Sequence, residues 1–280
     1  MRGLKEAIHQ TVQYSQSFGL VPDTDTIHRY LISPKTYPLQ IVTNLTPSLT
    51  TNQQKAIHLK QEISKNKIDK ATQIANLLSK IPSIKLICAT GSIAIDNADK
   101  NADLDLFMVT STDTLWLTRP LVFLILKVLR RRRSAKLTEH NSKKVKDKVC
   151  DNLWLDESAL KIPQKKRNLY TAHEVLQAKT LFDRGGYYQK FIQANSWTKT
   201  YLANAYAAAS CHPRGGGPWS PLRGDPSPLS FRPKWRNPFV VLNKLFFILQ
   251  YLYMKKKITH ETITLHSAFF HPNTPKFVDS

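Results

Sequence analysis

Asp103 and Asp105 stand two positions apart at the beginning of an apolar run, residues 104–109. Alternate side chains of a β-strand lie on one face, so this spacing predicts two neighbouring carboxylates, with Leu104 and Leu106 directed the other way into a core. Two carboxylates so placed are suitable ligands for a hard divalent cation. The pattern predicts a Mg²⁺ site, with Mn²⁺ as the alternative ion.

A Thr90-Gly91-Ser92 step precedes the aspartates and ends another mostly apolar run, residues 84–89. Ten residues separate Ser92 from Asp103. A glycine lets the backbone approach a phosphate closely, and backbone N–H groups near the start of a helix suit anions. The two motifs together predict a site that holds a nucleoside triphosphate through its metal ion, with Gly91 and Ser92 at the phosphates.

At these residues the chain resembles the DNA-polymerase-β-type nucleotidyltransferase superfamily. The signature of that superfamily is an apolar residue and Gly-Ser, a spacer of similar length, and then Asp-apolar-Asp-apolar, which matches Gly91, Ser92, Asp103 and Asp105. The resemblance implies an α+β fold whose nucleotidyltransferase core is a small mixed sheet flanked by helices. It also implies transfer of a nucleoside monophosphate from the triphosphate to a hydroxyl, with release of pyrophosphate.

The same resemblance implies a third catalytic carboxylate on a strand beside the Asp-x-Asp strand. Residues 149–155 are strand-like, and Asp151 is the candidate, with Asp156 as the alternative. In a regular strand these two residues lie on opposite faces, so at most one of them can serve. A surface salt bridge is the other role that either residue could have.

Residues 1–50 are predicted to form a helical module, with helices over residues 4–18, 24–31 and 39–45. Three such helices indicate a winged-helix or helix-turn-helix unit. The unit either contacts nucleic acid or packs on the catalytic domain or a partner protein. Packing is favoured because no clear basic recognition helix is present.

A wider resemblance covers roughly residues 10–205. In the stretches TVQYSQSFGLVP, TGSIAIDNADKNADLDLFMVT and LYTAHEVLQAKTLFDRGGYYQKFIQAN, the chain is similar to little-characterised bacterial and archaeal nucleotidyltransferase-domain proteins. In that group a winged-helix-like unit precedes the transferase core, which supports the predicted module but implies no substrate.

Residues 51–205 are predicted to form the nucleotidyltransferase domain. Apolar periodicity and capping signals predict the following elements: helices over 52–80, 114–129, 170–179 and 187–196, and strands over 84–89, 103–109 and 149–155. Residues 206–238 are predicted to be a Pro/Gly-rich linker. Residues 239–280 are predicted to be a C-terminal helical segment, and its histidines, His260, His266 and His271, do not have the spacing of a metal motif.

Basic residues outnumber acidic ones, 41 Lys and Arg against 20 Asp and Glu, which gives a formal net charge of +21. This excess favours a polyanionic partner, namely nucleic acid, an anionic membrane surface or nucleotide phosphates. The densest basic run, residues 130–148, either grips phosphates or forms a solvated loop.

Three widely spaced cysteines, Cys88, Cys150 and Cys211, form neither a disulfide framework nor a Cys-x-x-Cys site. They indicate a reducing cytoplasm, with Cys88 and Cys150 as core residues, and the first residues have no signal-peptide core.

Residues 121–129 are too short to span a bilayer, and residues 239–254 contain Asn243, Lys244 and Gln250. No integral membrane span is predicted, whereas contact with anionic lipid stays open because each run ends in a basic cluster.

The sequence leaves the acceptor of the nucleotide open. A protein hydroxyl, an RNA end and a small molecule all suit the predicted core, and the net charge favours nucleic acid. The alternative function is a nucleic-acid-binding regulator with a degenerate nucleotidyltransferase domain.

Overall fold

A computed structural model describes residues 2–132, 146–211, 222–223, 238–255, 258 and 261–270. At its centre lies a seven-stranded sheet with the order β5-β4-β1-β2-β3-β7-β6. The strands are β1 Ile84–Ala89, β2 Leu104–Thr110, β3 Val149–Asp156, β4 Lys179–Asp183, β5 Leu222–Arg223, β6 Thr262–Ile263 and β7 Ser267–Phe269. β2 and β3 are parallel, whereas β1 is antiparallel to both β2 and β4. The sheet is therefore mixed, in agreement with the predicted α+β class.

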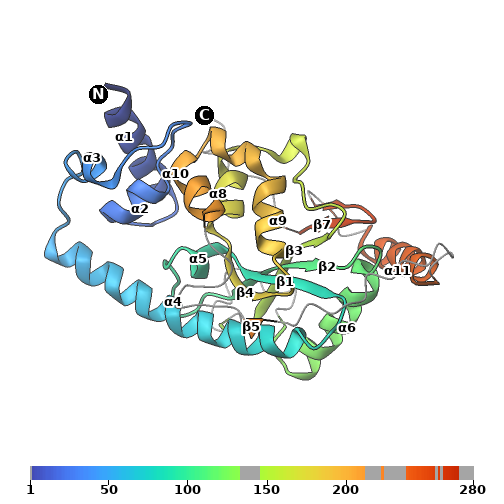
Figure 1. Ribbon diagram of the computed structural model, residues 1–280. Helices are drawn as coiled ribbons and strands as arrows, with labels where there is room; N and C mark the ends of the chain where they lie inside the picture. The colour runs from blue at the N-terminus through green and yellow to red at the C-terminus, as the bar shows by residue number, and fades with distance from the viewer. Residues whose placement is uncertain are drawn as a thin grey trace.

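Helices cover both faces of the sheet (Figure 1). One face packs against α4 (Thr51–Leu78) and α6 (Leu115–Val128). The other face packs against α8 (Leu169–Gln177), α9 (Tyr187–Ala194) and α10 (Ala203–Ser210). Short segments α5 (Gly91–Ala94), η2 (Gln164–Lys166) and η3 (Ser196–Thr200) connect these elements.

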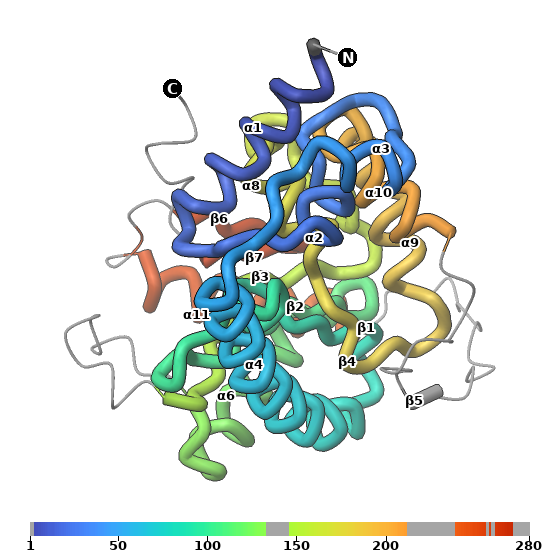
Figure 2. The backbone as a smooth tube through the Cα atoms, turned by 90° about the vertical axis from the view of Figure 1, so that its left-hand side faces the viewer, coloured from blue at the N-terminus to red at the C-terminus, as the bar shows by residue number. Residues whose placement is uncertain are grey.

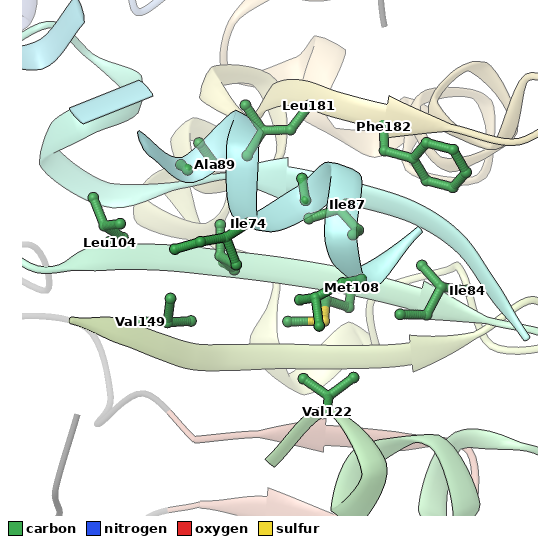
Figure 3. Close-up of a cluster of buried hydrophobic side chains, with 14 of the residues drawn as sticks. Ile74, Ile84, Ile87, Ala89, Leu104, Met108, Val122, Val149, Leu181 and Phe182 are labelled. Carbon is green, nitrogen blue, oxygen red and sulfur yellow. The ribbon is translucent and has the colours of Figure 1, made fainter. Parts of the chain in front are cut away.

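The apolar stripe of α4 explains how this helix binds the sheet. Ala71, Ile74, Ala75 and Leu78 are spaced as a helical face predicts, and all four are buried. Figure 3 shows Ile74 lying over side chains of β1 and β2 in this cluster. Burial of a side chain of this size stabilises the folded state by about 1.5–3 kcal/mol.

The N-terminal module consists of α1 (Arg2–Ser17), α2 (Thr24–Arg29) and α3 (Leu39–Thr43). It has a small core of its own, which is formed by Leu4, Ala7, Ile8, Ile27, Leu31 and Val42. Figure 2 shows the module at the end of the molecule where α8 and α10 lie.

Hydrogen bonds and one isolated bridge join this module to the segment that contains α10. The Asn204 side chain accepts a hydrogen bond from the Tyr37 N–H at 2.9 Å and donates one to the His28 carbonyl at 2.7 Å. An isolated bridge pairs Ser33 with Leu202, and within residues 2–50 no strands pair as a wing. These contacts support the packing interpretation of the module.

α6 contains a proline, Pro120, and a C-terminal helix packs against this part of α6. Proline has no N–H, so the carbonyl four residues earlier, that of Trp116, loses its helical donor. Gln250 of α11 (Pro238–Lys255) supplies the missing donor at 2.7 Å, and Asn243 accepts from the Trp116 N–H at 2.8 Å. The polar residues of the apolar run 239–254 therefore attach α11 to α6. No helix in the described part of the chain has the length and apolarity that a membrane crossing needs.

The predicted C-terminal helical segment, residues 239–280, is helical in α11 but not after it. After α11 the chain adds β6 and β7 to the sheet, and Leu153 of β3 pairs with Phe269. Strands of two and three residues have too few alternations to be recognised in a sequence. Residues 271–280 lie outside the described residues.

Two further boundaries differ from the predictions. β4 occupies residues 179–183, which the sequence did not assign to a strand, and α10 continues to Ser210, five residues into the predicted linker. The rest of that linker, apart from Cys211, β5 and Pro238, and residues 133–145 of the basic run lie outside the described residues.

A buried lysine ties α4 to the beginnings of two strands. Lys67 donates to the carbonyl of Ala102 at 2.7 Å and to Asp147 at 2.9 Å, and Lys70 also reaches Asp147 at 2.5 Å. The Asp147 N–H in turn donates to the Ala102 carbonyl. Ala102 precedes β2 and Asp147 precedes β3, so one ammonium group fixes both strand ends.

Replacing Lys67 with Met should lower the free energy of unfolding by about 2–3 kcal/mol, because a buried carboxylate and a carbonyl each lose one of their donors. Chemical denaturation measures this change. Lys65→Met, at an exposed position of the same helix, is the matched control and should have little effect. Equal stabilities of the two variants would contradict the assigned role of Lys67.

Candidate functional site

The sequence motifs meet at one edge of the sheet. Because β1 is antiparallel to β2 and β2 is parallel to β3, the carboxyl end of β1 meets the amino ends of β2 and β3. The Thr90 N–H donates to the Asp105 carbonyl at 3.0 Å. Carboxylate oxygens of Asp103 and Asp105 lie within 4.8 Å of each other and of the Cys150 sulfur. The structure thus brings the two predicted metal ligands together.

Gly91 lies directly against this pair. Its φ is +63°, and a Cβ atom built there would lie 2.5 Å from Oδ2 of Asp105. Any side chain would therefore both strain the backbone and displace the carboxylate. Ser92 follows at the start of α5 with a partly exposed side chain. Gly91 and Ser92 thus lie beside the aspartates, as the motif predicts.

Two residues that the sequence did not assign to the site complete it. The Asn152 amide donates to Oδ1 of Asp105, and its oxygen accepts from the Cys150 thiol at 2.7 Å. Cys150 was predicted to be a core residue, but it pairs with Asp105 in the β2–β3 register and is only partly buried. Asn152 orients Asp105 through a charge-assisted hydrogen bond.

Asp151, the predicted third carboxylate, points away from the site. It pairs in register with Leu106, whose side chain belongs to the core under α4 and α6. On that face it contacts Arg119 at 3.6 Å and Arg132 at 3.7 Å, and it accepts from the Trp154 indole at 3.2 Å. The geometry corrects the assignment, and Asp151 has the salt-bridge role.

Asp156, the alternative, is also remote from the aspartate pair. A register shift after Leu106 inserts one residue into β3, and Asp156 pairs with Thr110. Asp151 and Asp156 therefore lie on the same face, not on opposite faces as a regular strand would place them. Asp156 is fully buried at the far end of the strand and contacts Nδ1 of His266 at 2.6 Å.

Asp156 and His266 form a second acidic group with Asp113, and the potential ligand atoms lie within 4.8 Å of one another. The Asp156 carboxylate already accepts from the Ser158 N–H at 2.9 Å and contacts His266. These hydrogen bonds satisfy a buried carboxylate. The group is therefore explained as a structural network.

α8 brings aromatic and acidic side chains near the aspartates. Burial, with the negative charges of Glu174 and Asp105, raises the pKa of Tyr170. The centroid of the Phe18 ring, in the N-terminal module, lies 6.1 Å from the centroid of the Tyr170 ring. Burial also raises the pKa of Glu174 to about 7. The N-cap of α8 is Asn168, whose side chain accepts from the Thr171 N–H.

His173, which precedes Glu174 in α8, holds the N-terminal module against this helix. Burial lowers its pKa to about 3, so the ring is neutral near pH 7. Tyr14 stacks on it with 4.3 Å between ring centroids, and Gln177 hydrogen-bonds to its Nδ1 at 3.0 Å. An uncharged ring between aromatic neighbours is consistent with a packing role.

A scan against protein-family models and searches of curated proteins and of solved structures each found no match to this chain. The function must therefore be argued from the site itself.

Gly91→Ala should impair the site more than it impairs the fold. We expect a loss of about 1–2 kcal/mol from the left-handed backbone conformation and weaker Mg²⁺ or Mn²⁺ binding because Asp105 is displaced. Calorimetric titration of the metal and chemical denaturation measure the two effects. Gly19→Ala is the matched control, since Gly19 has a φ of +66° and open space around it. Metal binding by Gly91→Ala that equals that of Gly19→Ala would refute the contact.

Glu174→Gln should change the pH dependence of stability. The folded state raises this pKa from 4.5 to about 7, so the contribution of Glu174 is fully present below pH 4.5 and is lost as the pH rises through 7. Glutamine stays neutral at all these pH values. The free energy of unfolding of the variant, relative to that of the wild type, should therefore rise by about 1–3 kcal/mol as the pH increases from 4.5 to 7. Denaturation at pH 4.5 and pH 8 measures the difference. The exposed control Glu62→Gln should show no such trend, and a pH-independent difference for Glu174→Gln would refute the assignment.

Proposed function

We propose that this chain is a metal-dependent nucleotidyltransferase that moves a nucleoside monophosphate from a nucleoside triphosphate to an acceptor hydroxyl. One observation carries the proposal. Asp103 and Asp105 converge at the start of β2, where Gly91 leaves no Cβ between the β1–α5 turn and the Asp105 carboxylate. The order of these parts along the chain is the order that the sequence resemblance implies.

The residues present fit a hard cation. Asp103 and Asp105 offer carboxylate oxygens, which Mg²⁺ and Mn²⁺ prefer, whereas the Cys150 thiol suits softer metals. Asp103 and Asp105 would hold the ion, and Asn152 would keep Asp105 oriented. A bound Mg²⁺ would activate the attacking hydroxyl and stabilise charge on the leaving pyrophosphate.

In this reaction the acceptor oxygen forms a bond to the α-phosphorus, and the bond from that phosphorus to the pyrophosphate oxygen breaks. Ser92 and the N–H groups of Gly91 and Ser92 would contact the terminal phosphates. The acceptor proton passes to a base other than Asp151, which is held by Arg119 and Arg132 on the opposite face. The net charge favours a nucleic-acid acceptor over a protein hydroxyl or a small molecule. The chain carries Cys88, Cys150 and Cys211 as thiols, which suits a reducing cytoplasm.

A specific observation also favours the second candidate function, a nucleic-acid-binding regulator with a degenerate nucleotidyltransferase domain. On the site face of β3 the structure has Cys150 and Asn152 where a third carboxylate was expected. Such a site could bind a nucleotide without transferring it. Nucleotide binding and turnover must therefore be measured separately.

Titration of ATP, GTP, CTP and UTP into the protein with Mg²⁺ tests the proposal. We expect calorimetric binding of at least one nucleotide, and its loss with EDTA or in the Asp103→Asn/Asp105→Asn variant, because both remove the metal site. Asp69→Asn, at an exposed position of α4, should bind as the wild type does. Binding followed by pyrophosphate release in an acceptor screen supports the enzyme. Binding without release under all acceptors supports the regulator, and no binding of any nucleotide rejects the site.

A further inference from the structure

The outer face of α11 is apolar and exposed. It is formed by Val241, Leu242, Leu245, Ile248, Leu249 and Leu252, which are 42–62% exposed. These residues recur at helical spacing, so they form one continuous stripe along the helix. An exposed apolar surface of this extent usually marks an interaction site.

The outer face is not simply a core surface that failed to pack, because α11 is already attached by its opposite side. Asn243 and Gln250 hydrogen-bond to the backbone of Trp116, and the Phe247 ring lies 5.1 Å from the Trp116 ring. These contacts fix the rotation of α11 about its axis. The apolar stripe is therefore held outward by specific contacts.

The neighbouring helix α6 carries a second exposed apolar stripe. Leu121, Leu124 and Val128 are 44%, 56% and 73% exposed and follow the same helical spacing. Figures 1 and 2 both show α6 and α11 side by side, and their residues pack together.

All the charges carried by these two helices are positive. No Asp or Glu occurs in residues 115–132 or 238–255. Exposed basic residues accompany the apolar stripes, and they are Lys127, Arg130, Arg131, Lys244 and Lys255. Long lysine side chains can lie along an apolar surface while the ammonium group reaches a polar headgroup.

Apolar stripes that are accompanied only by positive charges favour one kind of partner. A second copy of the chain would place positive charges against positive charges, and a nucleic acid would leave the apolar stripe unused. An anionic bilayer offers both acyl chains for the stripe and negative headgroups for the lysines and arginines. We propose that the outer face of α11, with the adjacent stripe of α6, lies in the surface of an anionic lipid membrane and holds the protein there peripherally.

Vesicle flotation with the full chain tests this proposal. The probes are vesicles that contain phosphatidylglycerol and vesicles of phosphatidylcholine alone. We expect binding to the anionic vesicles only, with weakening at high salt because the headgroup attraction is screened. Leu249→Glu should weaken this binding by at least about tenfold, since an apolar contact is lost and a negative charge meets anionic lipid.

Leu59→Glu is the matched control, because Leu59 is 53% exposed on the distant helix α4 and the substitution changes the charge equally. Unchanged binding of Leu59→Glu and reduced binding of Leu249→Glu support the proposal. Equal binding of both variants would show a general charge effect and overturn it. Absence of vesicle binding overturns it too, and a wild-type dimer in analytical ultracentrifugation that Leu249→Glu dissociates would then assign the face to self-association.

Discussion

The candidate site depends on holding two like charges next to each other at the start of β2. Asp103 and Asp105 are forced onto one face by the two-residue period of the strand, and neighbouring carboxylates repel each other unless a cation or donors offset the charge. The chain places them where β2 begins, with partly exposed side chains. Asn152 donates to Asp105, and Gly91 leaves room for its Oδ2 atom. A cation between the two carboxylates would remove the remaining repulsion.

The strand ends around this pair are fixed from the opposite side of the sheet. Lys67 of α4 reaches the residue that precedes Asp103 and, through Asp147, the segment that leads into β3. The Leu104 N–H also donates to the Lys148 carbonyl at 2.7 Å, which aligns the two strand starts. The spacing between Asp105 and Cys150 therefore depends on a helix that contributes no residue to the site. Pre-alignment of this kind lowers the cost of binding an ion or a nucleotide.

Local periodicity predicts the parts of the fold that local sequence determines. The stripe of α4, the run of β1 and the alternation around Asp103 and Asp105 all follow from side-chain spacing. β4 and β7 could not be predicted in this way, because short strands are stabilised by partners distant in sequence. The position of Asp151 failed for another reason. Asp151 pairs with Leu106, whereas Cys150 pairs with Asp105, so Asp151 lies on the opposite face from Asp105. This alignment of β3 with β2 leaves no periodic signal in either strand, and the later register shift changes the face of Asp156 only.

The N-terminal module borders the candidate site, which changes how its role should be understood. The Phe18 ring lies near the Tyr170 ring, and the Asn97 amide donates to the Phe18 carbonyl at 3.3 Å. The negative charge of Asp105 contributes to the raised pKa of Tyr170. The module thus contributes aromatic surface within electrostatic reach of the aspartates. Aromatic side chains next to a phosphate-binding site are suited to stacking on a base. Under the proposed function, a module that packs in this way would take part in recognition of a nucleotide or an RNA end without entering a DNA groove, so the packing and nucleic-acid interpretations of residues 1–50 are compatible.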